Sequence, residues 1–212
     1  VMALESGRTF RHDTFEDYKG TRAEMPNELR VQIGRIRQLI DALDIPIVER
    51  ELYEADDVIG SLSAHCSRDL GLRVMVITGD TDLLQLVDDH VEVVLPGVKP
   101  KRFEDLRRFD LDAVNERYGF GPEFVPDYKA LVGDTSDNIP GVPDVGPKTA
   151  LQWIQKYGSL ENLYAHADEI EGKRGENLRI FKDQVFLSRQ FAFSIKIPGG
   201  GTGIRGDRHG AF

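Results

Sequence analysis

Cysteine, tryptophan and long apolar runs are scarce in this chain, and each scarcity excludes a class of protein. The 212 residues include one cysteine and one tryptophan. The single cysteine, Cys66, excludes an internal disulfide framework and suits a reducing compartment, so we expect a cytoplasmic protein. No apolar run approaches the ~20 residues that span a bilayer, and no signal peptide opens the sequence, so we expect no membrane association.

Positive charge is also in short supply. The chain has 27 Lys and Arg against 36 Asp and Glu, which gives a formal net charge of −9. Taken alone, this balance argues against a nucleic-acid binder, because the phosphate backbone rewards Lys and Arg. The sum misleads if the carboxylates are concentrated at a metal site, and basic residues do gather between positions 8 and 22. The distribution of charge therefore matters more than its total.

Three acidic clusters stand where a strand should end or a helix should begin. They are Glu54, Asp56 and Asp57; Asp80 and Asp82; and Asp134 and Asp137. Two carboxylates about 4 Å apart repel by roughly 4 kcal/mol at an effective dielectric of 20. Hard divalent ions such as Mg2+ or Mn2+ prefer oxygen ligands, and a pair of them can clamp the attacking and leaving oxygens of a phosphodiester. The clusters therefore predict metal-dependent phosphoryl chemistry.

Each cluster also has a purely structural interpretation. Acidic residues after Glu54 would interact favourably with the positive N-terminal end of a helix dipole, and Asp82 can serve as an N-cap. Asp134 can form a capping arrangement or an Asx turn before Pro140. Each motif alone is weak, but three in one chain, two of them tied to an α/β scaffold, favour the metal interpretation.

Strand and helix patterns alternate in the first half of the chain. Strands are predicted at residues 45–48, 73–78 and 91–95, and helices at residues 29–40, 55–67 and 82–87. This alternation predicts a largely parallel α/β sheet with right-handed crossovers. In such sheets, sites collect beyond the carboxyl ends of the strands, which is where Asp80 and Asp82 fall.

Helical patterns dominate the second half, because the strand signals stop after about Lys101. Helices are predicted at residues 111–118, 122–132, 147–157, 160–166 and 176–191. Residues 199–212 are glycine-rich without apolar periodicity and predict a flexible tail. The resulting division is an α/β core at 1–132, a helical subdomain at 133–198 and the tail at 199–212.

A glycine-lined turn runs from Gly141 to Gly146, followed by Pro147, Lys148 and Thr149. Such a turn exposes backbone N–H groups at a helix N-terminus, where a phosphate can bind. An ordinary helix–turn–helix connection is the alternative, and the paired glycines with Lys148 and Thr149 favour a clamp on the DNA backbone.

The basic segment contains Arg11, Tyr18, Lys19 and Arg22. Near a phosphate, Lys19 and Arg22 can stabilise developing negative charge, and Tyr18 can stack on an unpaired base. Neighbouring acidic residues make a solvated charged face equally acceptable, so the local pattern leaves both interpretations open.

Taken together, the motifs resemble the 5′-nuclease family, which includes flap endonucleases and the 5′→3′ exonuclease domains of bacterial DNA polymerase I. They occur in family order from about Arg8 to Pro198. The motifs are Phe10-Arg11-His12, Tyr18-Lys19-x-x-Arg22, Glu54-Ala-Asp-Asp57, Thr78-Gly-Asp-x-Asp82, Gly133-Asp-x-x-Asp-Asn-Ile-Pro-Gly141 and Gly146-x-Lys-Thr-Ala150.

The resemblance implies a PIN-like α/β nuclease core, with a mainly parallel sheet flanked by helices, and a C-terminal helix-hairpin-helix subdomain that grips duplex DNA. By motif match, the seven acidic residues become ligands of two Mg2+ or Mn2+ ions. Lys19 and Arg22 become phosphate-steering cations, and Tyr18 a base-stacking residue. The implied DNA-binding residues are Arg11, Gly141, Gly146, Lys148 and Thr149.

The implied reaction is attack of a metal-activated water on a DNA phosphodiester near a 5′ end or flap, in replication and repair. The resemblance also implies a monomer, a monovalent cation at the hairpin, and a polymerase domain in a full-length parent.

Three departures from the family pattern bear on activity. The family opens with an apolar strand that ends in a metal-binding Asp, and this sequence starts beyond it, so we expect a truncated member with part of its parallel sheet unpaired. Leu4 or Glu5 stands where the next family Asp belongs, and Glu5 can partly substitute. Asp144 replaces a hairpin glycine. A catalytically impaired DNA-binding remnant is therefore the main alternative, and an RNA-cleaving nuclease on a related core is a third.

Overall fold

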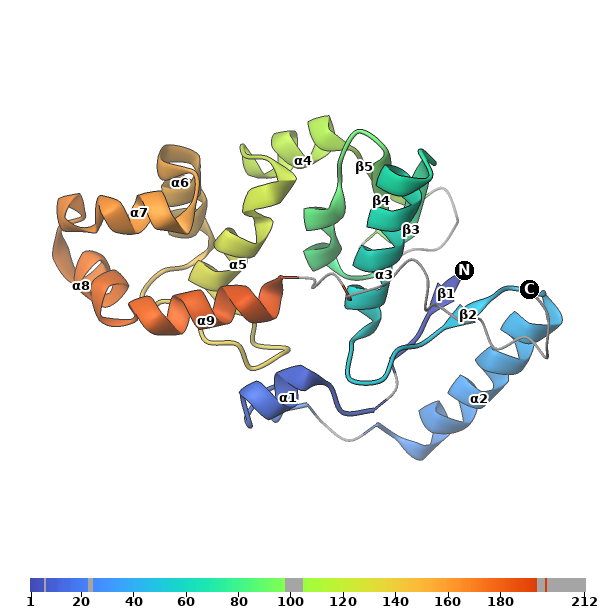
Figure 1. Cartoon of the computed structure of the whole chain (residues 1–212). Coiled ribbons are helices and arrows are strands. Elements are labelled where there is room, and N and C mark those ends of the chain that lie inside the picture. The colour runs from blue at the N-terminus through green and yellow to red at the C-terminus, as the bar shows by residue number, and fades with distance from the viewer. Residues whose placement is uncertain (6, 23–24, 98–104, 194–196, 198–212) are drawn as a thin grey trace.

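The strands of the described residues form two small sheets (Figure 1). The computed structural model describes residues 1–5, 7–22, 25–97, 105–193 and 197. In the first sheet, β1 (Met2–Ala3) pairs parallel with β2 (Ile47–Val48). In the second, β3 (Val74–Ile77) pairs parallel with β4 (Val91–Leu95), and β5 (Arg107–Phe109) pairs antiparallel with β4. The predicted, mainly parallel α/β sheet is thus present in two pieces.

The strands β3 and β4 form where the sequence is apolar on both faces of the pleat, which is typical of parallel strands. Val76 and Val93 are buried in the core, whereas Met75 and Ile77 on the alternate face of β3 are 46% and 64% exposed. The described residues contribute no strand to the second edge of β3. The prediction that strands end after about Lys101 was wrong for β5, whose Arg-Arg-Phe sequence carries only one apolar residue.

Short helices connect the strands of the first half. They are α1 (Phe10–Thr14), α2 (Asn27–Ala42), α3 (Ala55–Ala64) with a π-helical continuation (His65–Asp69), and a 3-10 helix (Thr81–Leu86). The predicted helix at 82–87 is therefore a 3-10 turn, in which Leu83 and Leu84 are fully buried. The π-helical turn accommodates the end of the helix predicted at 55–67.

The apolar stripe of the helix α2 is largely uncovered by the described residues. Leu29, Ile36 and Leu39 are 43%, 48% and 60% exposed, and only Ile40 on this helix is buried. The periodicity that predicted the helix is real, but the described residues pack little against its apolar side.

The second half is helical, as predicted. It contains α4 (Leu111–Tyr118), a 3-10 turn (Pro122–Phe124), α5 (Val125–Val132), α6 (Pro147–Tyr157), α7 (Leu160–Ala165), a 3-10 turn (Ala167–Glu169), α8 (Gly172–Ile180) and α9 (Lys182–Ala192). The single helix predicted at 176–191 is instead two helices, because the backbone turns at Phe181 (φ −94°, ψ 19°). Residues 199–212, the predicted tail, lie outside the described residues.

One hydrophobic core extends from the second sheet into the helices. Its fully buried members come from both sides of residue 132, and they include Val93 on β4, Leu131 on α5 and Ile154 on α6. Because residues on both sides of position 132 contribute to this core, the core does not mark a domain boundary. The predicted boundary at residue 132 therefore stays a prediction. No helix among the described residues is both long and apolar enough to cross a bilayer.

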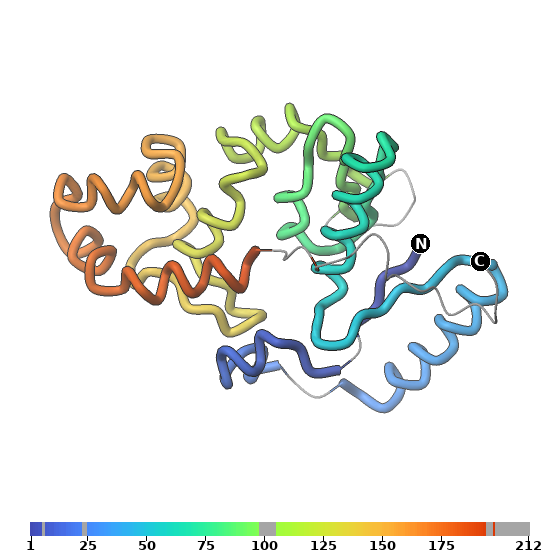
Figure 2. The backbone as a smooth tube through the Cα atoms, in the orientation of Figure 1, coloured from blue at the N-terminus to red at the C-terminus, as the bar shows by residue number. Residues whose placement is uncertain are grey.

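The loop between α5 and α6 folds back beside the segment that follows α1 (Figure 2). Val142 donates its backbone N–H to the carbonyl of Leu131 at 2.9 Å, which brings Gly141 against the end of α5. A methyl group on Gly141 would overlap the carbonyl of Val132 and lie 2.6 Å from the backbone nitrogen of Gly133. Only glycine fits this contact, which closes the loop that carries Asp134 and Asp137.

We expect Gly141→Ala to destabilise the protein by about 2 kcal/mol, because the added methyl group meets backbone that cannot rotate away. Gly146→Ala is the matched control, since a Cβ there meets nothing within 4 Å, and it should cost less than about 1 kcal/mol. Urea unfolding of the two variants measures the difference. Equal stabilities would contradict the close approach at Gly141.

Candidate metal and phosphate site

The second acidic cluster lies directly after β3. Asp80 is the N-cap of the 3-10 helix and accepts the backbone N–H of Asp82 at 2.8 Å. The predicted capping interaction is therefore present, with Asp80 rather than Asp82 as the cap. Because β3 and β4 are parallel, this turn stands beyond the carboxyl end of the sheet, where ligands bind in α/β proteins.

The first acidic cluster opens α3. Glu54 is the N-cap residue and is only 6% exposed. Lys19 donates to its Oε1 at 2.7 Å, and the hydroxyl of Tyr18 lies 3.2 Å from its Oε2. The basic segment and the start of α3 therefore meet, although they are separated by more than thirty residues.

The third acidic cluster sits in the turn after α5. Asp134 accepts both the N–H and the hydroxyl of Ser136, at 2.8 and 2.6 Å, which is the Asx turn considered from the sequence. Arg22 pairs with Asp137, and its Nε donates to the carbonyl of Ser136 at 3.1 Å. The Tyr18 hydroxyl also lies 3.2 Å from Asp137, so one tyrosine contacts the first and third clusters.

Lys129, on α5, connects the second and third clusters. Its Nζ lies 2.5 Å from Asp82 and 3.6 Å from Asp134, and its side chain is 18% exposed. Burial lowers the pKa of Lys129, but Asp82 and the other carboxylates raise it on balance, so the ammonium stays charged. Sequence reasoning missed this residue; the available signal was a lysine in the last turn of the predicted helix, five positions before Asp134.

The pKa values show that the three clusters share one electrostatic environment. Burial raises the pKa of Asp56 to about 7, with further contributions from the negative charges of Asp80, Glu54 and Asp82. Burial also raises the pKa of Asp82 to about 6, where Lys129 opposes the shift and Asp80 and Asp134 add to it. At Asp82 the attraction of Lys129 offsets the repulsion by the other carboxylates, so burial accounts for the raised pKa, whereas at Asp56 burial and repulsion act together.

Asp134 is the exception among these carboxylates. Its burial raises the pKa, but the two hydrogen bonds from Ser136 and the charge of Lys129 outweigh burial, and the net pKa is lowered. Asp134 is thus the member of the site that holds its negative charge most readily.

The donor set fits a hard divalent ion in its chemistry. Every candidate ligand is a carboxylate, and burial with carboxylate neighbours makes the charged forms of Asp56 and Asp82 costly, a cost that a bound cation would lower. Within the described ranges, however, no three His, Cys, Asp or Glu side chains converge as a ready-made metal site. Lys19, Arg22 and Lys129 contact these carboxylates, and Arg11 lies 3.7 Å from Glu54.

Asp57 occupies a different position from the other predicted ligands. It is fully buried, and both of its oxygens accept hydrogen bonds from Arg11, at 2.6 and 2.8 Å. Arg11 is 2% exposed and also donates to the backbone carbonyls of Phe191 and Phe193. Arg11 is thus buried and Asp57 is engaged in an ion pair with it, so the structure gives no support to the predicted DNA contact of Arg11 or metal contact of Asp57, and both stay predictions.

Tyr18 is also placed differently from the prediction. Its ring is 2% exposed, stacks on Phe191 with centroids 5.6 Å apart, and meets the edge of His12. Burial, followed by the charges of Glu54 and Asp137, raises the pKa of its hydroxyl. The ring is buried in this structure and the hydroxyl contacts Glu54 and Asp137, so base stacking by Tyr18 stays a prediction without structural support.

The turn that is predicted to bind phosphate leads into α6. Gly146 is the N-cap of α6, Pro147 opens the helix, and Lys148 is exposed beside it. Thr149 is half-buried in the first turn. The helix N-terminus therefore faces open space, since nothing lies within 4 Å of a Cβ placed on Gly146.

Asp144 adopts the left-handed backbone expected for a glycine position, with φ of 64°. Its carboxylate pairs with Lys173 on α8 at 2.8 Å, and its pKa is lowered by that contact. Its negative charge is therefore partly neutralised within the protein. Glu5, the other departure, lies 3.8 Å from the Nζ of Lys19 and so reaches the edge of the acidic clusters.

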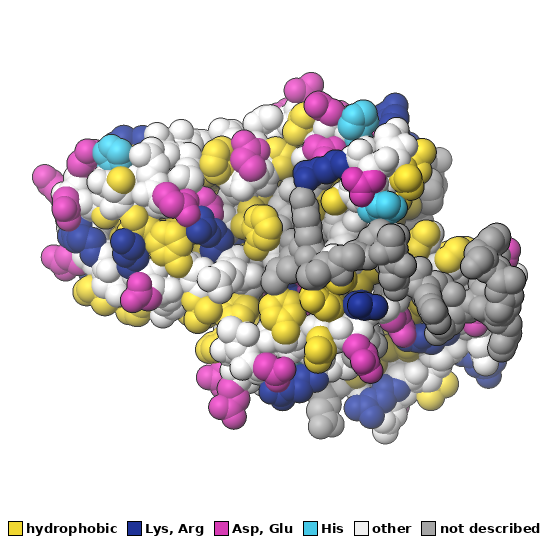
Figure 3. All heavy atoms as spheres, viewed as in Figure 1, with side chains coloured by type: hydrophobic (Ala, Val, Ile, Leu, Met, Phe, Trp, Pro, Cys, Tyr) yellow, Lys and Arg dark blue, Asp and Glu magenta, His cyan; other side chains and the backbone are white. Residues whose placement is uncertain are grey.

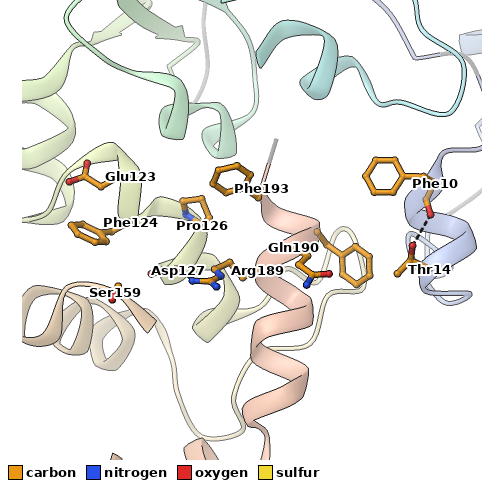
Figure 4. Close-up of a pocket in the computed structure, with 11 residues that line it drawn as sticks. Phe10, Thr14, Glu123, Phe124, Pro126, Asp127, Ser159, Arg189, Gln190 and Phe193 are labelled. Carbon is orange, nitrogen blue, oxygen red and sulfur yellow. Dashed lines mark hydrogen bonds and ion pairs between the residues drawn. The ribbon is translucent and has the colours of Figure 1, made fainter. Parts of the chain in front are cut away.

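A cavity of about 550 Å³ lies between α1, α5 and α9 (Figure 4). Its apolar wall consists mainly of Phe10, Phe124, Phe191 and Phe193. Hydrophobic side chains also gather on the surface where α9 lies beside α1 (Figure 3). None of the predicted metal ligands lines this cavity, so the acidic site and the cavity are separate features.

Comparison with known families matches nearly the whole chain. Residues 1–119 match the family model of the 5′-3′ exonuclease N-terminal resolvase-like domain, and residues 120–196 match that of the 5′-3′ exonuclease C-terminal SAM fold. DNA polymerase I of Bacillus caldotenax is 43% identical over 91% of this chain, and that of Caldicellulosiruptor bescii is 46% identical over 88%. The chain spans only 22% of the length of each of these relatives.

Solved structures share the fold. The T5 D15 protein co-crystallised with metal ions matches with a TM-score of 0.71 and 24% identity, over 90% of this chain and 73% of that one. The catalytic core of Rad2 in complex with a DNA substrate matches with a TM-score of 0.55 and 16% identity, over 86% of this chain and 56% of that one. These matches confirm the predicted fold class, an α/β nuclease-type core followed by a small helical domain.

We expect Arg11→Met to destabilise the protein by about 3–5 kcal/mol, because it leaves Asp57 charged and unpaired in the interior. The double variant Arg11→Met/Asp57→Leu should recover much of that loss, since no buried charge remains. Arg8→Met is the control: Arg8 and Asp13 form an ion pair whose side chains are 67% and 63% exposed, worth less than about 1 kcal/mol. Chemical denaturation measures all three, and a mild effect at Arg11 would contradict the buried pair.

The raised pKa of Asp56 predicts a pH-dependent stability in the presence of a chelator. A carboxyl whose folded pKa is about 7 and whose unfolded pKa is near 4 loses stabilising free energy as the pH rises between those values. Asp56→Asn should therefore match the parent near pH 4 and exceed its Tm at pH 8 by roughly 2–4 °C, equivalent to about 1 kcal/mol. Asp112→Asn, an exposed change on α4, should show no such trend. A parallel profile for Asp56→Asn and the parent would contradict the repulsion at Asp56.

Proposed function

Because this chain belongs to the 5′-3′ exonuclease family, we propose that it is a divalent-metal-dependent nuclease that hydrolyses DNA phosphodiesters near 5′ ends or at flap junctions. The observation that carries this proposal is the gathering of carboxylates from three separate stretches of chain, linked by Tyr18 and Lys129. The related T5 D15 protein has been crystallised with metal ions, and the Rad2 core with a DNA substrate.

Six carboxylates are the proposed ligands, directly or through water. They are Glu54, Asp56, Asp80, Asp82, Asp134 and Asp137. Two Mg2+ or Mn2+ ions would supply activation of the attacking water and stabilisation of the leaving 3′-oxygen. The protein's own contribution is to hold these oxygens at one site against their mutual repulsion, beyond the carboxyl end of β3 and at the start of α3.

Lys19 and Arg22 are proposed to steer the scissile phosphate. Each now contacts a carboxylate, Lys19 at Glu54 and Arg22 at Asp137, so both lie at the border of the acidic site. A phosphate that arrives there meets two cations on one short segment, which can stabilise its charge as it develops in the transition state.

The hairpin is proposed to hold the DNA backbone beside this site. Gly146 can offer its backbone N–H at the N-terminus of α6, and exposed Lys148 adds a positive charge. The backbone N–H of Thr149 already donates to the carbonyl of Gly146 at 3.0 Å, so Thr149 would contact DNA through its side-chain hydroxyl. A monovalent cation bound at the Gly141–Gly146 turn is part of the same proposal, as is action as a monomer. The matched relatives are DNA polymerases I, so a role beside a polymerase domain in replication and repair is proposed as well.

A DNA-binding remnant with an impaired metal centre is the second candidate. It is favoured by two observations: no three of the described candidate ligands converge, and Asp57 is committed to Arg11. In this case the hairpin would still bind duplex while hydrolysis is lost. The two candidates differ in whether bound DNA is cut.

A 5′-flap oligonucleotide with Mg2+ or Mn2+ tests the proposal. We expect cleavage by the parent chain and a loss of at least about 100-fold in rate for Asp80→Asn and for Asp134→Asn, since each removes a charge from the site. Asp112→Asn, on the surface of α4, is the control and should cleave normally. Cleavage that survives both site substitutions would defeat the carboxylate assignment.

The same assay separates the alternatives. Flap binding without cleavage, measured by fluorescence anisotropy, would favour the remnant. Preference for single-stranded RNA over flapped DNA would favour an RNA-cleaving nuclease.

A further inference from the structure

Lys129 occupies a position that two acidic clusters share. Its Nζ lies 2.5 Å from an oxygen of Asp82, which follows β3, and 3.6 Å from an oxygen of Asp134, which follows α5. The lysine belongs to neither motif, since it projects from the last turn of α5. A single ammonium thus joins two carboxylates that come from different elements.

Lys129 and its two partners are partly buried, so water screens the repulsion between the two carboxylates poorly. Its side chain is 18% exposed, and the side chains of Asp82 and Asp134 are each 22% exposed. In such a partly enclosed place two like charges repel strongly, so a cation between them contributes more than it would at the surface. Lys129 therefore supplies a positive charge where a divalent ion would also have its greatest effect.

We propose that Lys129 is a built-in counter-ion that competes with a divalent ion for Asp82 and Asp134, and so sets the metal affinity of the site. This inference rests on the proposed function, because it assumes that these carboxylates bind metal. Lys129 acts as a positioning residue: it holds the carboxylates together before a metal binds, and its withdrawal is a condition of binding.

The competition follows from distance and charge. A Mg2+ ion binds carboxylate oxygens at about 2.0–2.1 Å, so a metal bound to Oδ1 of Asp82 would take the place of the ammonium that lies 2.5 Å from that oxygen. A doubly charged ion and an ammonium on one oxygen also repel each other. The flexible four-carbon stem of lysine permits withdrawal, whereas the planar arginine group would hold a carboxylate by two hydrogen bonds.

Mn2+ titration by isothermal calorimetry at fixed ionic strength tests the inference without any substrate. We expect Lys129→Met to lower the apparent Kd for Mn2+ by tenfold or more, because the competing charge is gone. Lys129→Arg, which keeps the charge, should bind Mn2+ no more tightly than the parent. Lys156→Met removes one positive charge from exposed α6 and should change the Kd by less than twofold.

A double-variant cycle separates direct competition at Asp82 from a general change in the electrostatic potential of the site. In an Asp82→Asn background the ammonium has lost its 2.5 Å partner, so Lys129→Met should change the Kd by less than about threefold. An undiminished tenfold effect in that background would overturn competition at Asp82. Urea unfolding with chelator reports any structural cost of Lys129→Met separately from the Kd.

The outcomes distinguish this inference from the proposed function. Binding of Mn2+ by the parent with an equal or weaker affinity in Lys129→Met overturns the competition and leaves the metal-dependent nuclease standing. Binding by Lys129→Met but not by the parent supports the competition in its strongest form. Absence of Mn2+ binding in both chains overturns the metal centre and the competition together.

Discussion

Mutual repulsion among carboxylates is the constraint on which this structure depends. The acidic residues come from the end of β3, the start of α3 and the turn after α5, and basic side chains lie among them. Burial is the largest cause of the raised pKa values of Asp56 and Asp82, and neighbouring carboxylates add to it. Each basic contact therefore lowers the cost of holding these partly buried carboxylates together.

The ion pair of Arg11 and Asp57 provides the fixed frame for this strained arrangement. Arg11 joins α1 to the first turn of α3 through Asp57 and to the end of α9 through two backbone carbonyls. Asp57 also accepts the backbone N–H of Glu54, so the same carboxylate sets the start of the helix that presents Glu54. The buried pair supports the acidic site from behind without taking part in its chemistry.

Much of this organisation could be predicted from the sequence, and the exceptions have physical reasons. The α/β order, the helical second half and the meeting of the acidic motifs follow from periodicity and from the motifs themselves. The roles of Arg11 and Tyr18 did not follow, because a basic or aromatic residue beside a phosphate site looks the same in sequence whether it faces DNA or a buried carboxylate. Lys129 was missed for a related reason: only folding brings α5 beside the turn after β3. The break at Phe181 was also invisible, because the apolar periodicity continues through it.

The free side of β3 has a consequence for the behaviour of the protein in solution. Its second edge has no strand from the described residues, and its outer face shows Met75 and Ile77 to solvent. Unpaired backbone groups beside apolar side chains form a template on which other chains can add as strands. Of the edge strands among the described residues, β3 combines an unoccupied side with exposed apolar side chains, so addition of a strand from another chain there would favour self-association as the concentration rises.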